Sequence, residues 1–173
     1  GYEYFSSPDP VADAELIYFT NDLFKSFKLK NIFFEINSIG CNTCRLRYKK
    51  ALKSYYRSKL KYLCKDCQTR FKNNPLRILD CKKESCLVYK KNAPQSLDYL
   101  CKGCKIHFQE VLEYLDNFKI PYVLNPYLVR GLDYYNRTVF EVVISEKKLE
   151  TEEDINSTLS LGGGGRYDYL IEY

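Results

Sequence analysis

The chain has 173 residues, a formal net charge of +5 and 45% hydrophobic residues, which suits one ordinary globular domain or two small ones. This composition excludes a disordered or collagen-like chain, and no stretch approaches the ~20 uncharged apolar residues of a membrane-spanning helix. The sequence begins without methionine and shows no signal peptide, so we expect an internal piece of a longer, cytoplasmic protein.

The first 40 residues predict a helix followed by a strand. Asp9 and Pro10 are typical of a helix start, since aspartate caps helix N-termini and proline fits the first helical position. The helix, over 9–27, is expected to bury apolar residues at helical spacing: Ala12, Leu16, Phe19, Leu23 and Phe27. Residues 31–37 predict a strand with Ile32, Phe34 and Ile36 on one face.

Two further helices are predicted in the middle of the chain. The first, over 45–63, carries eight Lys or Arg residues and no acidic residue. Its expected buried side consists of Tyr48, Leu52, Tyr55, Tyr56 and Leu63. The second covers about 102–118, with an apolar stripe of Phe108, Val111, Leu112, Leu115 and Phe118.

Beyond Pro121 the pattern changes to strands. We expect strands over 122–124, 132–135, 138–144 and 159–161, with an acidic loop over 146–154. Around the second of these, alternation places Arg130, Leu132 and Tyr134 on one face and Asp133 and Tyr135 on the other. The last strand runs into four glycines at 162–165, which suit either a tight turn or close approach of a ligand to the backbone.

Charge divides the chain sharply. Residues 41–106 hold 18 Lys and Arg but 4 Asp and Glu, which leaves 9 basic and 18 acidic residues elsewhere. All eight cysteines lie in the same basic stretch. We interpret this stretch as a basic insertion in an acidic host. Its interleaved tyrosines favour contact with nucleic-acid phosphates over a merely solvated helix face.

The cysteines form four close pairs, three with the spacing C-x2-C and one with C-x4-C: Cys41/Cys44, Cys64/Cys67, Cys101/Cys104 and Cys81/Cys86. Four such pairs match two tetrahedral zinc sites with four thiolates each. A helix over 45–63 would span roughly 28 Å, so the first two pairs cannot share an ion. The pair at 41 and 44 must then join either the pair at 81 and 86 or the pair at 101 and 104.

Structural zinc is the favoured interpretation of these cysteines. Disulfides are typical of secreted proteins, and nothing in the sequence indicates secretion. Iron–sulfur ligation and simple free thiols are less favoured than zinc but stay open. Because His107 is the single histidine, the zinc sites would be closed four-cysteine sites that hold the insertion together and perform no chemistry.

Two motifs near the end of the chain carry the most specific signal. The first is Arg130-Gly-Leu-Asp-Tyr-Tyr135, followed by Thr138-Val-Phe-Glu141, and the second is Gly164-Gly-Arg-Tyr-Asp168. Both resemble signature segments of the histidyl-tRNA synthetases, and residues 13–15, 37–40 and 74–80 are similar to further segments of that family. The resemblance runs over essentially the whole chain in the family's order.

The resemblance implies an α+β fold, with part of the antiparallel sheet of a class II aminoacyl-tRNA synthetase and flanking helices. A helical insertion domain would interrupt this core, and the cysteines make it a zinc-stapled one. The implied domains are catalytic core over 1–40, insertion over 41–125 near the tRNA acceptor stem, and catalytic core with the histidine-specific motifs over 126–173. The implied enzyme activates histidine with ATP and Mg²⁺ to histidyl-adenylate and transfers it to tRNA(His), as a homodimer when full-length.

The resemblance also implies roles for single residues. Arg130 would contact the histidine carboxylate and the α-phosphate, where a fixed cation stabilises the negative charge that develops during attack. Glu3 and Tyr135 would meet the two ring nitrogens of the substrate, because a neutral imidazole offers one donor and one acceptor. Tyr134 and Tyr167 would form walls of the same pocket.

The sequence also departs from the family pattern. The ATP-clamping residues, two class motifs and the anticodon-binding domain are expected outside these residues, so the piece alone is predicted to be inactive. Tyr169 stands where the family pattern leads us to expect glycine. Two alternatives stay open. One is a catalytically inactive paralogue, such as the regulatory subunit of ATP phosphoribosyltransferase. The second is a zinc-stabilised RNA-binding module that uses 41–106 alone.

Overall fold

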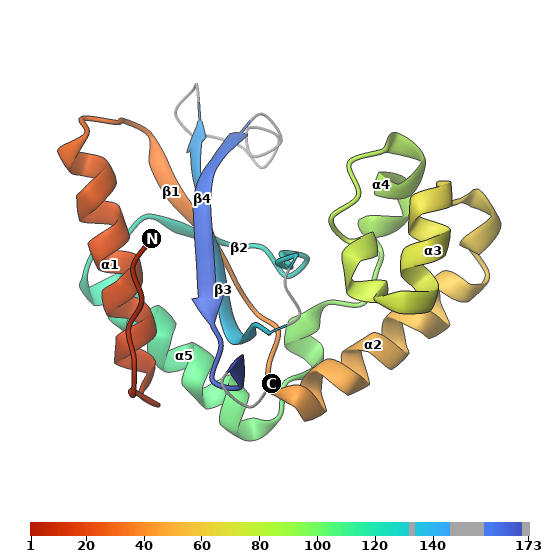
Figure 1. The fold of residues 1–173 in the computed structure, drawn as a ribbon, viewed down its shortest axis with the longest axis horizontal. Coiled ribbons are helices and arrows are strands. Elements are labelled where there is room, and N and C mark those ends of the chain that lie inside the picture. The colour runs from red at the N-terminus through yellow and green to blue at the C-terminus, as the bar shows by residue number, and fades with distance from the viewer. Residues whose placement is uncertain (132–133, 146–157, 171–173) are drawn as a thin grey trace.

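The computed structural model describes residues 1–131, 134–145 and 158–170 (Figure 1). In Figure 1 a sheet stands in the middle, α1 lies on one side of it, α5 runs below it, and α2, α3 and α4 form a separate lobe on the other side. The predictions for Leu132, Asp133 and the acidic loop fall outside the described residues. The mixture of helices with one sheet confirms the α+β fold class.

The described part of the sheet has four strands in the order β2-β1-β3-β4. These strands are β1 (Ile32–Ser38), β2 (Tyr122–Leu124), β3 (Asn136–Ser145) and β4 (Thr158–Arg166). The pairs β1–β3 and β3–β4 are antiparallel, as predicted, but β2 is parallel to β1, with Tyr122 opposite Phe34. The long connection between β1 and β2 permits this exception, because parallel neighbours need a crossover and cannot be joined by a tight turn.

The two faces of the sheet differ in chemistry. The back face carries buried Phe34, Ile36, Phe140 and Val142, which form one apolar cluster with residues of α1 (Pro10–Ser26) and α5 (Lys102–Asn117). The front face carries Glu35 and Glu141, which lie directly opposite each other on β1 and β3, together with Asn37 and Val139. The front face therefore combines charged and polar side chains with apolar ones.

The predicted buried stripe of α1 is wrong in most of its members. Phe19 is 54% exposed and Phe27 63% exposed, whereas Ala14 and Ile17 are fully buried. Both sets recur at helical spacing, so periodicity alone does not distinguish them. The helix packs on α5 and the sheet through the face that carries Ala14 and Ile17, and Phe19 lies outside that face.

The insertion consists of short helices. They are α2 (Asn42–Arg57), η1 (Leu60–Tyr62), α3 (Lys65–Asn73), η2 (Pro75–Ile78), α4 (Glu84–Lys90) and η3 (Ser96–Tyr99). The helix predicted over 45–63 thus ends at Arg57, and a 3-10 turn follows it. Tyr48, Leu52, Tyr56 and Leu63 are buried as predicted. The elements α5 and β2 fall inside the range 41–125 but pack with the sheet.

Candidate active site

Arg130 lies over the front face of the sheet, at the strand pair β3–β4. Its Nη1 atom is 3.1 Å from Oε1 of Glu141, and the two side chains are 26% and 27% exposed. Glu141 comes from β3, so the guanidinium is tethered to the sheet while part of it stays open to solvent. A partly exposed, fixed guanidinium is suited to bind an anionic group in two-point contact.

The glycines of β4 make room for this arginine. The strand continues through all four glycines as a partner of β3, which excludes a tight turn there. A Cβ atom at Gly163 would lie 2.6 Å from the carbonyl oxygen of Phe140 and 2.8 Å from Nη1 of Arg130. At Gly165 it would lie 2.7 Å from the carbonyl oxygen of Thr138. The guanidinium therefore rests directly on a backbone without side chains.

Three tyrosines gather beside this backbone. The ring centroids of Tyr134 and Tyr135 are 4.7 Å apart, and those of Tyr134 and Tyr167 are 5.8 Å apart. The prediction that Tyr134 and Tyr135 point to opposite faces is wrong, because these residues precede β3 in non-strand conformation and their rings pack together. The structure thus brings Tyr134, Tyr135 and Tyr167 together.

The hydroxyl group of Tyr167 and the side chain of Tyr135 are both buried. Burial raises the pKa of Tyr135, the neighbouring Tyr134 raises it further, and the opposing effect of Arg130 is smaller. Tyr135 is therefore a neutral donor at physiological pH. The hydroxyl of Tyr167 is buried and has no hydrogen-bond partner within the described part of the chain.

Glu3 is not brought to this cluster. It is exposed on the N-terminal segment, where the neighbouring Tyr2 contacts α1 through Thr20 and Phe19. Within the described ranges no hydrogen bond or ion pair links Glu3 to Arg130 or to the tyrosines. Its role in binding a histidine ring stays a prediction.

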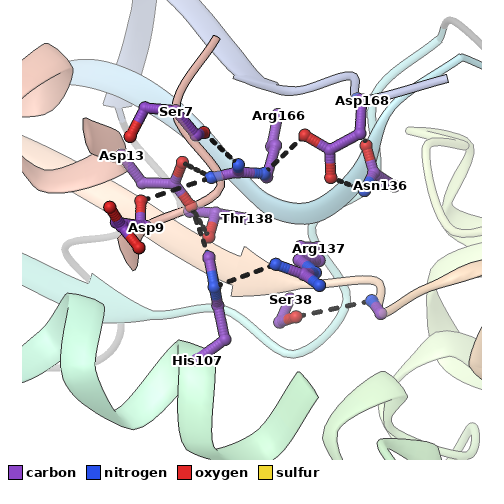
Figure 2. A network of polar contacts seen from close by, with 11 residues as sticks. Ser7, Asp9, Asp13, Ser38, His107, Asn136, Arg137, Thr138, Arg166 and Asp168 are labelled. Carbon is purple, nitrogen blue, oxygen red and sulfur yellow. Dashed lines mark hydrogen bonds and ion pairs between the residues drawn. The ribbon is translucent and has the colours of Figure 1, made fainter. Parts of the chain in front are cut away.

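A buried polar network, which the sequence reasoning missed, includes Arg166 and Asp168, the residues on either side of Tyr167 in the sequence (Figure 2). Its centre is Asp13 on α1. Oδ2 of Asp13 accepts hydrogen bonds from Thr138 Oγ1 at 2.6 Å and His107 Nε2 at 2.9 Å, and its Oδ1 pairs with Arg166 at 2.9 Å. The network therefore joins both back-face helices to β3 and β4.

His107 has a defined tautomer in this network. Its Nδ1 faces the guanidinium of Arg137 at 3.2 Å, and a guanidinium only donates hydrogen bonds. Nδ1 must therefore accept, so the ring proton lies on Nε2 and is donated to Asp13. The single histidine of the chain is a structural bridge between Asp13 and Arg137.

The residues before and after Tyr167 in the sequence both belong to this network, which therefore positions Tyr167. Arg166 pairs with Asp13 and Asp168, and it also donates to the backbone carbonyl of Ser7. Asp168 and Asn136 exchange two hydrogen bonds of 2.7 and 2.8 Å. Arg166 and Asp168, the charged residues of the second motif, therefore hold Tyr167 in place. In the sequence, their membership of this motif was the one sign that they matter.

The cysteines form two separate groups of four. In each group the four Sγ atoms lie within 4.8 Å of one another: Cys41, Cys44, Cys101 and Cys104 in one, and Cys64, Cys67, Cys81 and Cys86 in the other. The structure selects the pair at 101 and 104 as the partner of the pair at 41 and 44, and it keeps the first two pairs apart as predicted. Backbone N–H of Cys104 lowers the pKa of Cys101.

Basic side chains line the surface of the insertion. Several are exposed along α2, among them Arg47, Lys50, Lys53 and Arg57. One shallow depression includes Arg57 and Lys61 in its lining, and another includes Arg70 and Arg77. No helix among the described residues is long and apolar enough to cross a membrane.

Comparison with known proteins gives a consistent result. The chain is 48% identical over 174 residues to "Histidine--tRNA ligase" of Caldicellulosiruptor bescii and 45% identical over 172 residues to the protein of that name from Clostridium novyi. These alignments cover 99% of this chain but 39% and 38% of the relatives. The chain thus spans well under half the length of these curated relatives. No family model matches it.

The fold agrees with this result. The crystal structure of apo S. aureus histidyl-tRNA synthetase matches with a TM-score of 0.69 and 33% identity, over 96% of this chain and 38% of that one. A Bacillus halodurans structure described as an ATP phosphoribosyltransferase regulatory subunit/histidyl-tRNA synthetase has a TM-score of 0.54 at 20% identity over 96% of this chain and 45% of that one. This second similarity concerns the fold alone.

Proposed function

The chain is homologous along its whole length to the histidyl-tRNA synthetases, and from this premise we propose that it is the central part of a histidine–tRNA ligase. It would contribute the histidine pocket and the tRNA-binding insertion. The observation that supports this most directly is Arg130 resting on the glycine backbone of β4, tethered to Glu141 and adjoining three tyrosines.

In the proposed reaction the histidine carboxylate attacks the α-phosphorus of ATP, which binds as its Mg²⁺ complex, and pyrophosphate leaves. Negative charge grows on the phosphate oxygens during this step. Arg130 would stabilise that charge, because its guanidinium is held in place before the reaction and is partly shielded from water. Glu141 would orient the arginine, and Gly163 would let it lie flat against the strand.

Histidine would be recognised by the tyrosine cluster. Tyr135 stays a neutral donor, so its hydroxyl would donate to the unprotonated ring nitrogen of the substrate. The buried hydroxyl of Tyr167 would gain a partner from the substrate. Tyr134 would form a wall of the pocket. A side chain without ring nitrogens would leave these buried hydroxyls unpaired, which is a strong source of discrimination.

The insertion would bind the acceptor stem of tRNA(His). Its exposed Lys and Arg offer the positive surface that phosphates require, and such contacts position an RNA without reading its sequence. We further propose that the full-length protein is a cytoplasmic homodimer that transfers histidine from the adenylate to the tRNA.

Two competing functions account for fewer of the features. A non-catalytic regulatory paralogue shares the fold, but it would not require a tethered arginine over a glycine strand or a basic insertion. An RNA-binding module confined to 41–106 would leave the tyrosine cluster and Arg130 without a role.

The test is histidine-dependent exchange of pyrophosphate into ATP by the full-length protein. We expect exchange with histidine and with no other amino acid, and a loss of roughly 100-fold or more in Arg130→Ala, as is common when a preorganised charge donor is removed. Lys30→Ala serves as the control, because it removes one exposed positive charge from the segment between α1 and β1, outside the insertion. A folded protein that binds histidine without exchange would instead support the regulatory function.

A further inference from the structure

We propose that the eight cysteines form two independent, mononuclear zinc sites with different roles. The neck site consists of Cys41, Cys44, Cys101 and Cys104, and the distal site consists of Cys64, Cys67, Cys81 and Cys86. The neck site holds the insertion to the histidine pocket, and the distal site stabilises the outer part of the insertion. The two metal sites are inferred from the geometry of the cysteines alone. The effect of the neck site on histidine binding also depends on the proposed function.

The sulfur positions suit a single ion. Zinc–sulfur bonds of ~2.3 Å at tetrahedral angles place neighbouring sulfurs about 3.8 Å apart. The Sγ atoms of Cys41 and Cys44 are 3.6 Å apart, and those of Cys64 and Cys81 are 3.9 Å apart. Disulfide bonds of about 2.0 Å do not fit these distances. A cluster of several irons would hold its thiolates further apart, since each thiolate binds a different iron.

Backbone groups stabilise the charge of the thiolates. Each C-x2-C pair begins at the N-cap of a helix: Cys41 at α2, Cys64 at α3 and Cys101 at α5. The positive end of a helix dipole lies at that position. The backbone N–H groups of Cys41 and Cys101 also donate across the neck site, to Cys104 Sγ at 3.3 Å and to Cys44 Sγ at 3.1 Å.

The distal site repeats this arrangement with one difference. The N–H of Cys64 donates to Sγ of Cys86 at 3.4 Å, but Cys86 lies inside α4 and reaches the site through the longer C-x4-C spacing. The site thereby joins α3 to the segment before α4 and to α4 itself. Three of its four cysteines are buried. The distal site lies within the insertion and connects two short helices, α3 with 9 residues and α4 with 7 residues.

The neck site occupies the point where the chain leaves and re-enters the core. The chain passes from β1 through Gly40 into Cys41, and it returns through Cys101 into α5. Gly40 has φ of +68°, and a Cβ there would lie 2.4 Å from Cβ of Cys44. The two ends of the insertion are therefore packed against each other at the sulfur cluster.

Contacts of the first turns of α2 connect the neck site with the pocket. Arg45, which directly follows Cys44, donates through Nη1 to the carbonyl oxygen of Tyr135 at 2.9 Å. The N–H of Arg137 donates to the carbonyl of Gly40 at 2.9 Å. Both contacts hold the backbone on either side of the turn into β3. A displaced α2 would therefore shift Tyr135.

Metal content is the first test, on the purified full-length protein by elemental analysis. We expect two zinc ions per chain, and one in each of the double variants Cys101→Ser/Cys104→Ser and Cys81→Ser/Cys86→Ser. Gly103→Ala, where a Cβ meets nothing within 4 Å, and Lys82→Ala, at an exposed position, are controls that keep both ions. Iron in place of zinc, thiols that titrate without metal, or loss of both ions in either double variant would overturn the proposal.

Histidine-dependent exchange is the second test. A misplacement of about 1 Å at a pocket residue costs up to about 100-fold in rate. We therefore expect kcat/KM for histidine to fall roughly 10-fold to 100-fold in the neck variant, and to stay within about twofold of wild type in the distal variant. Equal exchange in both variants would overturn the division of roles. Absence of exchange in the wild type would refute the proposed function and leave the metal count intact as a test.

Cobalt replaces zinc as a probe where a double variant fails to fold. Tetrahedral cobalt thiolate sites absorb strongly in the visible range, and the wild-type protein should bind two equivalents with that spectrum. The single variants Cys104→Ser and Cys86→Ser should each lose about half of this absorption. A spectrum without tetrahedral thiolate bands would overturn both sites.

Discussion

Gly163→Ala is the sharpest test of the candidate site, because it adds one methyl group beneath Arg130. The new Cβ would lie 2.6 Å from the carbonyl oxygen of Phe140 and 2.8 Å from Nη1 of Arg130. The carbonyl belongs to the backbone of β3 and cannot move without distorting the ladder. The arginine must therefore move away from the strand, and its contact with Glu141 is lost or displaced.

The expected size follows from the kind of contact that is lost. A hydrogen bond to a charged group contributes about 1.5–3 kcal/mol, which corresponds to a loss of roughly 10-fold to 150-fold in kcat/KM for pyrophosphate exchange. The overpacked strand pair also loses about 1–3 kcal/mol of stability. The assay is histidine-dependent exchange by the full-length variant, with thermal unfolding measured in parallel.

Two neighbouring glycines supply matched controls. A Cβ at Gly162 meets nothing within 4 Å, so Gly162→Ala should leave both activity and stability close to wild type. A Cβ at Gly164 would lie 3.0 Å from the ring of Phe140 on the back face, so Gly164→Ala should lower stability with a smaller effect on kcat/KM. Wild-type exchange in Gly163→Ala, or equal losses in all three variants, would refute the position assigned to Arg130.

Three further predictions concern the network, the pocket and the insertion. Asp13→Ala removes the carboxylate shared by Arg166, His107 and Thr138, while Arg166 keeps its ion pair with Asp168, so we expect the free energy of unfolding in urea to fall by about 1–3 kcal/mol, whereas Glu15→Ala on the exposed side of the same helix should change it little. Tyr135→Phe removes a neutral hydroxyl and keeps the ring, so KM for histidine in the exchange assay should rise about 2-fold to 10-fold. Leu52→Ala empties a fully buried position of α2 and should cost about 2–5 kcal/mol, with a larger loss in tRNA affinity, measured by filter binding, than in exchange.

Each of these has an outcome that contradicts it. An unchanged urea midpoint in Asp13→Ala would mean that the network contributes nothing net to the fold. An unchanged KM in Tyr135→Phe would remove its hydroxyl from histidine recognition. Equal losses of tRNA affinity and exchange in Leu52→Ala would show that the two functions are not separable at this position.

Local patterns predicted much of the fold. Helix starts at Pro10 and Lys102, the strand at 122–124 and most of the buried residues of α2 and α5 follow from capping residues and apolar periodicity. The cysteine pairing was limited to two choices by helix length alone, and the structure selects one of them. These features depend on residues close together in the sequence.

The features that sequence reasoning missed depend on distant residues. Asp13 meets Thr138 and Arg166 across 125 and 153 positions, and no local period reveals such contacts. The buried face of α1 was misassigned because two helical stripes compete, and α5 and the sheet cover the one that contains Ala14 and Ile17. The prediction that the side chains of Tyr134 and Tyr135 point to opposite faces was wrong, because side chains alternate only inside a strand and both residues precede β3.

The insertion and the tyrosine cluster share one hydrophobic core, and this bears on the proposed function. Tyr48, Leu52 and Tyr56 of α2 belong to the same buried cluster as Tyr135 and Val139 at the front face of the sheet. A separate RNA-binding module would instead close its core within 41–106 and leave the sheet free. Since apolar side chains from both parts are buried together, a shift of the basic lobe changes the packing behind the pocket. An RNA that binds the insertion and moves it would then change the packing of Tyr135, because both parts contribute to this one cluster.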